Sequence, residues 1–264
     1  MIDTSRPSVA RVYDCFLGGK DNYEVDRQVF QQVDAVAPQM KHLARAGRNW
    51  LIRVTRFLAG TAGIDQFLDC GAGLPAAENT HQAAQRMNAD SRVVYIDNDP
   101  VVAAHGRALL EENDRTHLVM ADLTDPDEIF ANPDVTRYLD LTRPVALIHC
   151  STMHHVSDEE RPLEIMRRYI ELLPSGSYLV LSHFHDPQDG GEGTKLARLV
   201  EDIFARGAMG SGYFRTRAEI EAYFAGLELV DPGITRLNDW WPDGPLNPRT
   251  VADDVALGGV ARKP

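Results

Sequence analysis

The chain has 264 residues, of which 44% are hydrophobic and 25% are charged, as in globular proteins with a large apolar core. It carries 27 lysines and arginines against 39 aspartates and glutamates, so its formal charge is −12. An acidic chain repels a phosphate backbone, and we therefore exclude nucleic acid as its main partner.

The N-terminal residues precede any strand pattern. The opening MIDTSRPSVARVYD has no basic segment before an apolar run, and no apolar stretch reaches the ~20 residues of a spanning helix. We expect no membrane segment and a cytoplasmic location, with three reduced cysteines.

Residues 1–38 indicate two short helices around a Gly-Gly loop, and residues 40–58 indicate a longer helix. For the arginines of the longer helix we favour a solvated side, and leave open contact with an anion.

From residue 60 onward, short β-branched runs alternate with amphipathic stretches, the pattern of a parallel sheet covered by helices. Two capping boxes, Ser157-x-x-Glu160 and Thr216-x-x-Glu219, predict helix starts. Residues 186–193 and 232–254 have the composition of insertions. The seven expected strands are 64–69, 92–97, 117–121, 145–150, 178–184, 227–230 and 255–261.

A glycine-rich turn follows the first expected strand in the segment FLDCGAGLP. Gly71 and Gly73 allow a ligand to press against the backbone, and the helix that follows offers free N–H groups. Pro75 stands where a dinucleotide fold has its third glycine, so the GxGxxG fingerprint is absent. An NAD-dependent oxidoreductase is therefore disfavoured.

Three successive strands end in an acidic residue, namely Asp69, Asp97 and Asp122. Any one of them alone is as well explained by a helix cap or a turn. Together they mark the sheet edge where such folds bind ligands. There a carboxylate can accept hydrogen bonds from both hydroxyls of a ribose or from the amino group of an adenine.

Residues 60–264 resemble the class I S-adenosylmethionine-dependent methyltransferases through DCGAGLP, YIDND, ADL and LPSGSYLVLSHF. The resemblance implies a Rossmann-like, seven-stranded, mostly parallel sheet with helices on both faces and an antiparallel last strand. It assigns the loop glycines to the methionyl part of the cofactor, Asp97 to the ribose, and Asp122 with Leu123 to the adenine. The cofactor-binding residues expected in this core are Asp69, Gly71, Gly73, Asp97, Asn98, Asp122 and Leu123.

The segment PSVARVYDCFLGGKDNYEVDR is similar to the opening of an actinobacterial family of S-adenosylmethionine methyltransferases, ARVYDYLLGGKDN. This resemblance covers the whole chain and leaves the reaction unassigned. We expect residues 1–59 to form a helical cap on the 60–264 core, with Asn22 and Tyr23 touching the cofactor. The alternative is a helical pair that packs on the sheet edge for stability alone.

Histidines gather after the fourth and fifth strands. Methyl transfer needs the acceptor to be aligned and, for a hydroxyl or ammonium, deprotonated, so His154 and His155 are the candidate bases. They can equally line the pocket without moving a proton. His183-x-His185-Asp186 is a poor metal site, because no further Cys or His completes a tetrahedral set.

The sequence thus predicts an S-adenosylmethionine-dependent methyltransferase that acts on a small-molecule acceptor and yields S-adenosylhomocysteine. The alternative is a non-catalytic S-adenosylmethionine-binding sensor or interaction module, which needs no open space beside the methyl group. The adjacent Trp240 and Trp241 fit a lid, an interface of a homodimer, or the core.

Overall fold

The structure is a computed structural model that describes residues 5–109, 113–245 and 248–264. Its strands are β1 (Gln66–Cys70), β2 (Arg92–Asp97), β3 (Thr116–Met120), β4 (Ala146–Cys150), β5 (Tyr178–Phe184), β6 (Glu228–Leu229), β7 (Thr235–Arg236) and β8 (Ala256–Arg262). Its α-helices are α1 (Val9–Leu17), α2 (Glu24–Val36), α3 (Met40–Gly60), α4 (Thr80–Met87), α5 (Pro100–Leu109), α6 (Pro126–Ala131), α7 (Pro133–Tyr138), α8 (Pro162–Leu172), α9 (Glu192–Ala205) and α10 (Arg217–Ala222). The 3-10 helices are η1 (Met153–His155), η2 (Asp158–Glu160), η3 (Leu237–Asp239) and η4 (Val251–Val255).

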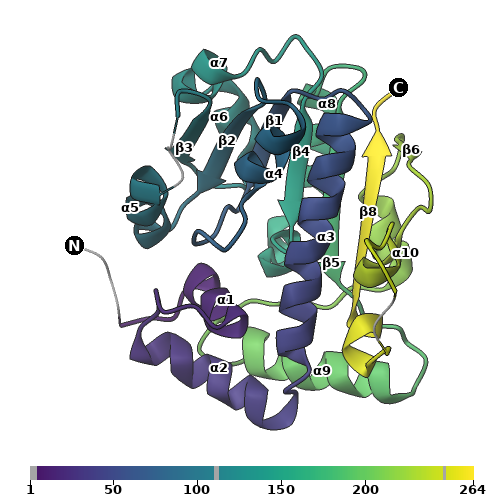
Figure 1. The fold of residues 1–264 in the computed structure, drawn as a ribbon. Helices are drawn as coiled ribbons and strands as arrows, with labels where there is room; N and C mark the ends of the chain where they lie inside the picture. Colours follow the sequence, from purple (N-terminus) through teal and green to yellow (C-terminus); the bar gives the residue numbers. More distant parts are fainter. Residues whose placement is uncertain (1–4, 110–112, 246–247) are drawn as a thin grey trace.

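The sheet follows the order β3-β2-β1-β4-β5-β8-β6, and β7 pairs with β8 beside this path (Figure 1). Strands β1 to β5 pair in parallel, whereas β8 runs antiparallel to β5 and to β6. The expected Rossmann-like α/β fold with an antiparallel last strand is confirmed. Within the described residues the sheet has eight strands rather than the expected seven. The additional strand is the two-residue β7, which lies inside the expected insertion at residues 232–254 and pairs with Gly258 and Leu257 of β8.

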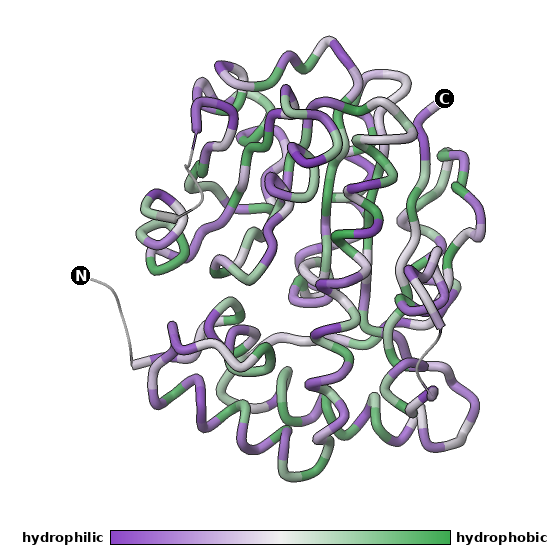
Figure 2. The backbone as a smooth tube through the Cα atoms, in the orientation of Figure 1, coloured by the Kyte–Doolittle hydropathy of each residue, from purple (hydrophilic) through white to green (hydrophobic). Residues whose placement is uncertain are grey.

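Alternate strand residues supply two separate cores, because successive side chains point to opposite faces of a sheet. Phe67, Val93 and Ala146 face the layer that contains α3 and α9. Leu68 and Val94 face the layer of α6, α7, α8 and α10. Figure 2 shows the hydrophobic residues concentrated in the central strands, as expected for parallel strands covered on both faces.

The long helix α3 lies across one face of the sheet (Figure 1). Trp50 is fully buried and touches the backbone of β8, where a Cβ on Gly258 would lie 2.8 Å from its ring. The expected solvated arginine side is only partly correct. Arg53 is buried and donates to the carbonyls of Leu237 and Trp240 at 2.7 and 3.1 Å, so it ties α3 to η3 and the residue after it.

Two local expectations differ from the structure. The capping box of Ser157 and Glu160 caps the start of η2, and α8 begins only at Pro162, because Arg161 takes a left-handed conformation with φ 57° between the two helices. Of the expected insertion at residues 186–193, residues 186–191 form a loop, but the last two begin α9, which packs against η4 and α2. In the part of the chain that the structure describes, no helix is long and apolar enough to cross a membrane.

Candidate functional site

A cavity of about 590 Å³ opens at the carboxyl ends of the parallel strands, where α/β sheets bind their ligands. Every parallel strand from β1 to β5 contributes residues at or just past its end, and the start of α1 covers the opposite side. Nine of the expected site residues line this one cavity. They are Asp69, Gly71, Gly73, Asp97, Asn98, Asp122, Leu123, His154 and His155.

The glycine turn has a conformation and a setting that require glycine. Gly71 has φ +83°, its N–H donates to the Ile96 carbonyl at 2.7 Å, and a Cβ there would lie 2.3 Å from Thr152 Cγ2. Gly73 has φ +64°, and a Cβ there would meet no atom within 4 Å. The turn is therefore held by β2 behind it and leaves free space in front of Gly73 for a ligand.

Asp69 is a buried carboxylate at the end of β1. Thr80 Oγ1 donates to its Oδ2 at 2.6 Å. Burial raises the pKa of Asp69 to about 6, while the hydroxyl of Thr80 and the charge of Arg48 act in the opposite direction. A cation placed in the cavity beside this carboxylate would stabilise its ionised form.

Asp97 connects the end of β2 to the glycine turn. Its Oδ2 accepts the N–H of Gly73 at 2.9 Å, and its Oδ1 accepts the N–H of Asp99 at 2.9 Å. Burial raises the pKa of Asp97, and these backbone donors lower it in part. Each carboxylate oxygen has a second lone pair, so two ligand hydroxyls can still bind to it.

The third acid, Asp122, is exposed on the cavity rim, where its Oδ1 accepts the N–H and the hydroxyl of Thr124 at 2.9 and 2.8 Å. Beside it, the Leu123 carbonyl accepts the Tyr169 hydroxyl at 2.8 Å. Both contacts fix the β3 end of the cavity, and Asp122 Oδ2 keeps no partner among the described residues.

The imidazoles at the ends of β4 and β5 divide into two kinds. Burial lowers the pKa of His154 well below its ordinary value and that of His155 to about 4, so both are neutral at pH 7. His155 Nδ1 lies 2.9 Å from Ser211 Oγ, whereas the buried His154 Nδ1 has no partner within the described structure. His183 is already committed, because its Nδ1 contacts the Phe184 carbonyl at 2.7 Å and its Nε2 a donor nitrogen of Arg215 at 3.2 Å.

Two further histidines that the sequence places near these strand ends do not line the cavity. His149 lies on the other face of the sheet against Tyr169, and burial lowers its pKa to about 3. His185 Nδ1 contacts the Asp254 carbonyl at 2.8 Å. Among the described residues, no three Cys, His, Asp or Glu side chains gather as metal ligands.

Beyond the carboxylates the cavity becomes apolar. His154 stacks on Phe184 with ring centroids 3.6 Å apart, and Phe184 in turn lies parallel to Phe204 of α9. None of the α9 contributions was expected from the sequence, which gives no local sign that this helix returns to the site. The large apolar residues of this half are Phe16, Met40, Leu43, Leu51, Phe184, Phe204, Met209 and Leu237.

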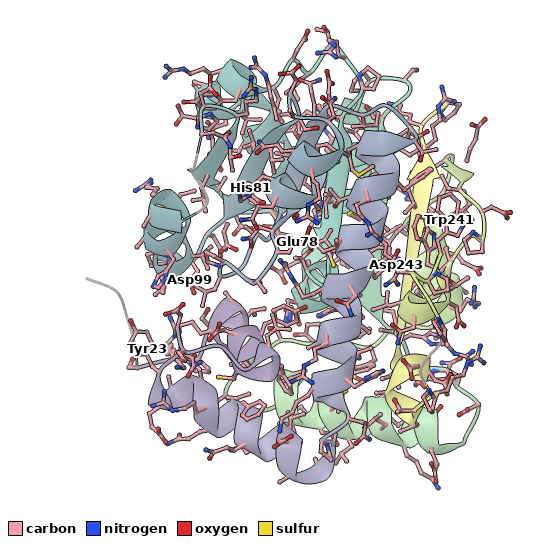
Figure 3. The ribbon with its side chains drawn as sticks, in the orientation of Figure 1. Tyr23, Glu78, His81, Asp99, Trp241 and Asp243 are labelled. Carbon is pink, nitrogen blue, oxygen red and sulfur yellow. The ribbon has the colours of Figure 1, made fainter. Side chains whose placement is uncertain are left out.

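The N-terminal cover is built from residues other than those expected. Asn22 and Tyr23 do not line the cavity. Asn22 Nδ2 donates to Asp14 Oδ2 at 2.8 Å, and Tyr23 is 39% exposed, at the outer side of the molecule below Asp99 (Figure 3). Residues 6–13 and Phe16 line the cavity instead. The apolar spacing of Val9, Val12 and Phe16 is the sequence signal that marks this inner helix side.

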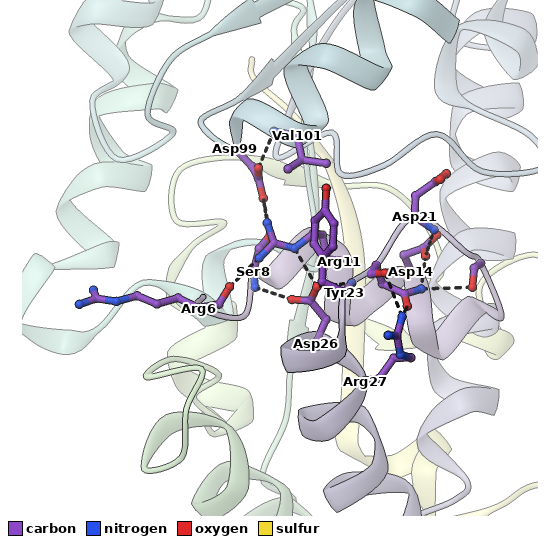
Figure 4. A network of polar contacts seen from close by, with 12 residues as sticks. Arg6, Ser8, Arg11, Asp14, Asp21, Tyr23, Asp26, Arg27, Asp99 and Val101 are labelled. Carbon is purple, nitrogen blue, oxygen red and sulfur yellow. Dashed lines mark hydrogen bonds and ion pairs between the residues drawn. The ribbon is translucent and has the colours of Figure 1, made fainter. Parts of the chain in front are cut away.

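A polar network holds this cover against the end of β2 (Figure 4). The Ser8 hydroxyl donates to Asp99 Oδ2, and Arg11 Nη1 lies 3.8 Å from the same oxygen. Arg11 also donates to Asp26 Oδ2 at 2.8 Å, in a pair that is almost fully buried. The start of α1 is thus joined both to α2 and to the strand end that carries Asp97.

Arg48 of α3 is a site residue that the sequence analysis did not single out. It lines the cavity close to Asp69, and its Nη2 donates to the Glu78 carbonyl at 2.6 Å. Its position in the basic series of α3 was the available signal. Only the packing of α3 on the sheet shows that Arg48, rather than a neighbouring arginine, lines the cavity.

The comparisons with known proteins agree with this architecture. A family model described as S-adenosyl methyltransferase matches residues 1–264. A comparison with curated proteins finds no significant match. A protein from Thermobifida fusca YX, provisionally described as a methyltransferase, is 41% identical, with a TM-score of 0.89 over 99% of this chain and 96% of its own. A DUF574 family protein from Streptomyces avermitilis MA-4680 is also 41% identical, with a TM-score of 0.92 over the full length of both chains.

A more distant structure shares only the fold. The N-methyltransferase NodS from Bradyrhizobium japonicum WM9, solved with S-adenosyl-L-homocysteine, is 11% identical. Its TM-score is 0.51 over 96% of this chain and 99% of its own.

Proposed function

The chain belongs to the family of S-adenosyl methyltransferases, and from that membership we propose that it methylates a small molecule held in the apolar half of the cavity. Its cofactor is S-adenosylmethionine. The observation that carries the proposal is the cavity itself. Its volume of about 590 Å³ lies in the range of sites that enclose small ligands, and it extends from the carboxylates to Phe184 and Phe204.

The residues present fit the cofactor. The open face of Gly73 leaves room for a ligand against the backbone, and the buried carboxylate of Asp69 suits an ammonium group. Asp97 with Asn98 is placed for the ribose, and Asp122 with Leu123 for the adenine. The cover from residues 6–13 is the protein's means of excluding water from these groups.

S-adenosylmethionine supplies an electrophilic methyl group on a sulfonium, and the protein must align an acceptor in line with it. The stacked side chains of Phe184 and His154 offer a flat apolar wall for that acceptor. The neutral His154 can accept a hydrogen bond or a proton at Nδ1, because this atom has no partner among the described residues. His155, held by Ser211, is the second candidate base.

A sensor that only binds the cofactor would not need the apolar half of the cavity. The space lined by Phe16, Met209 and Phe204 continues past the cofactor-facing residues. This continuation favours turnover over sensing.

Calorimetry and a transfer assay test the proposal. S-adenosylhomocysteine should bind and NADH should not. The substitution Asp97→Ala should leave the protein folded and weaken S-adenosylhomocysteine binding by about 2–3 kcal/mol, because a charged hydrogen-bond acceptor is lost. Methyl-labelled S-adenosylmethionine should label the small-molecule fraction of a cell extract. Label that enters only protein or nucleic acid would refute the small-molecule acceptor, and NADH binding without S-adenosylhomocysteine binding would refute the cofactor site.

A further inference from the structure

A second cavity, of about 860 Å³, lies on the other side of Tyr13 and Arg48 from the first. It is bounded by the loop after α1, one side of α3, the loop after the glycine turn and the segment after η3. We name it the basic cavity for its five cationic side chains. They are Lys20, Arg45, Arg48, Arg53 and Arg56.

Two of the five cations are already engaged. Arg53 donates to the two carbonyls beside η3, and Arg56 pairs with Asp243. The other three make no ion pair among the described residues, although the charge of Arg48 acts on Asp69. Lys20 and Arg45 make no hydrogen bond or ion pair with any residue the structure describes, and Arg48 donates only to the Glu78 carbonyl.

Four acids also line the basic cavity, namely Asp14, Asp21, Glu78 and Asp243, and their charges offset four of its five cations. Glu78 pairs with Arg86 at 2.9 Å, and Asp243 with Arg56 (Figure 3 labels both acids, on either side of α3). Asp14 accepts the N–H of Asp21 and the amide of Asn22.

Asp21, the fourth acid of this lining, lies 3.8 Å from His105 of α5. The five cations therefore exceed the four acids of this lining by one charge in a chain whose net charge is −12, and Lys20 and Arg45 have no direct partner among the described residues. This concentration against the overall charge focuses a positive potential inside the hollow.

We propose that the basic cavity binds a soluble small molecule that carries a phosphate group, with Lys20, Arg45 and Arg48 as its charged contacts. A phosphate monoester has about two negative charges and three acceptor oxygens at neutral pH, and so matches several cations at once, whereas a single carboxylate matches one. The volume suits a molecule of metabolite size. The two cavities share Ala10, Tyr13 and Arg48 in their linings, but the proposal does not depend on the function proposed for the first cavity.

Pyrophosphate is the probe for calorimetry on the full chain. We expect it to bind, more weakly as salt is added, and to bind about tenfold more weakly to the double variant Lys20→Gln/Arg45→Gln. The matched control is Lys195→Gln/Arg198→Gln, which makes the same charge change on exposed residues of α9 that line neither cavity. It should bind pyrophosphate as the unmodified protein does.

Several results would overturn the proposal. If pyrophosphate does not bind, the proposed site does not exist. An equal loss of affinity in both double variants would show only a general effect of net charge. Competition by saturating S-adenosylhomocysteine would place the anion in the first cavity instead. Binding of S-adenosylhomocysteine to the double variant, measured alongside melting temperature, reports separately on the cofactor site and on folding.

Discussion

The buried carboxylate of Asp69 is held in the folded protein at a cost. Its pKa moves from 3.8 to about 6 because burial penalises the charge more than the Thr80 hydrogen bond favours it. Between these two values the unfolded chain binds fewer protons than the folded one, so this group lowers stability as the pH rises from about 4 to about 6.

Asp69→Asn should therefore stabilise the cofactor-free protein above pH 7 by up to about 3 kcal/mol, and have little effect at pH 4. The amide oxygen can still accept the Thr80 hydroxyl. Melting temperatures measured from pH 4 to pH 8 check this prediction. The control is Asp114→Asn at an exposed position, whose melting temperature should differ from that of the unmodified protein by the same amount at every pH. The prediction is wrong if Asp69→Asn changes the melting temperature by the same amount at pH 4 and at pH 8.

The unpartnered Nδ1 of His154 gives a second prediction at this scale. His154→Asn keeps a polar side chain but cannot take a proton, so the rate of labelled-methyl transfer should fall by about 10²–10⁴ while S-adenosylhomocysteine affinity is unchanged. His117→Asn, outside the cavity, should change neither quantity. An unchanged rate in the His154 variant would mean that this imidazole only packs on Phe184.

At the scale of elements, α1 decides how the cofactor side of the cavity is covered. Ser8 precedes α1 and makes no side-chain cap bond to it, so its hydroxyl serves only the contact with Asp99. Asp99 in turn accepts the N–H of Val101 at 2.7 Å at the start of α5. The cover and the start of α5 therefore share one carboxylate, just past the end of β2.

Ser8→Ala should loosen α1 without unfolding it. We expect faster hydrogen exchange in residues 9–17 and about tenfold faster dissociation of S-adenosylhomocysteine, because a hydrogen bond to a charged group is lost. Thr216→Val removes an equivalent hydroxyl-to-carboxylate bond, to Glu219 at the start of α10, and should leave both quantities alone. Unaltered dissociation in Ser8→Ala would show that α1 does not retain the cofactor.

At the scale of the whole molecule, α3 joins the N-terminal residues to the sheet. Trp50 and Leu58 of α3 are fully buried in the same core as Val260 of β8. The expected boundary at residue 59 thus falls at the end of a helix that packs both on the sheet and on α1 and α2. We propose that residues 1–59 and 60–264 unfold together, and that only residues 6–13 and Phe16 act as the cover.

Gly258→Ala tests that unit. A Cβ there would lie 2.7 Å from Leu237 and 2.8 Å from Trp50, so α3 and η3 must both shift, at a cost of about 1–3 kcal/mol. Thermal unfolding should keep one transition at a lower midpoint. Gly244→Ala, where a Cβ would meet nothing within 4 Å, should melt as the unmodified protein does. Two separate transitions would contradict a single folding unit.

The local sequence predicted the elements that depend on local chemistry. Short apolar runs predicted seven of the eight described strands to within about two residues. The glycine turn with its three acids was predicted because each acid lies within two residues of the end of its own strand. The capping box of Thr216 starts α10 as expected, since it needs only residues three apart. The Ser157 box failed to start α8, because the backbone at Arg161 reverses after one short turn.

The sequence by itself therefore determined the sheet, its family and the carboxylate edge of the cavity, because periodicity and strand-end position are properties of neighbouring residues. Tertiary structure alone decided which part of the N-terminal segment faces the cavity, that α9 brings Phe204 to it, and that Lys20 after α1 shares a second hollow with the arginines of α3. These three features depend on contacts between residues far apart in the chain. The burial of whole helix faces selects one packed arrangement over another, and no local sequence pattern encodes that selection.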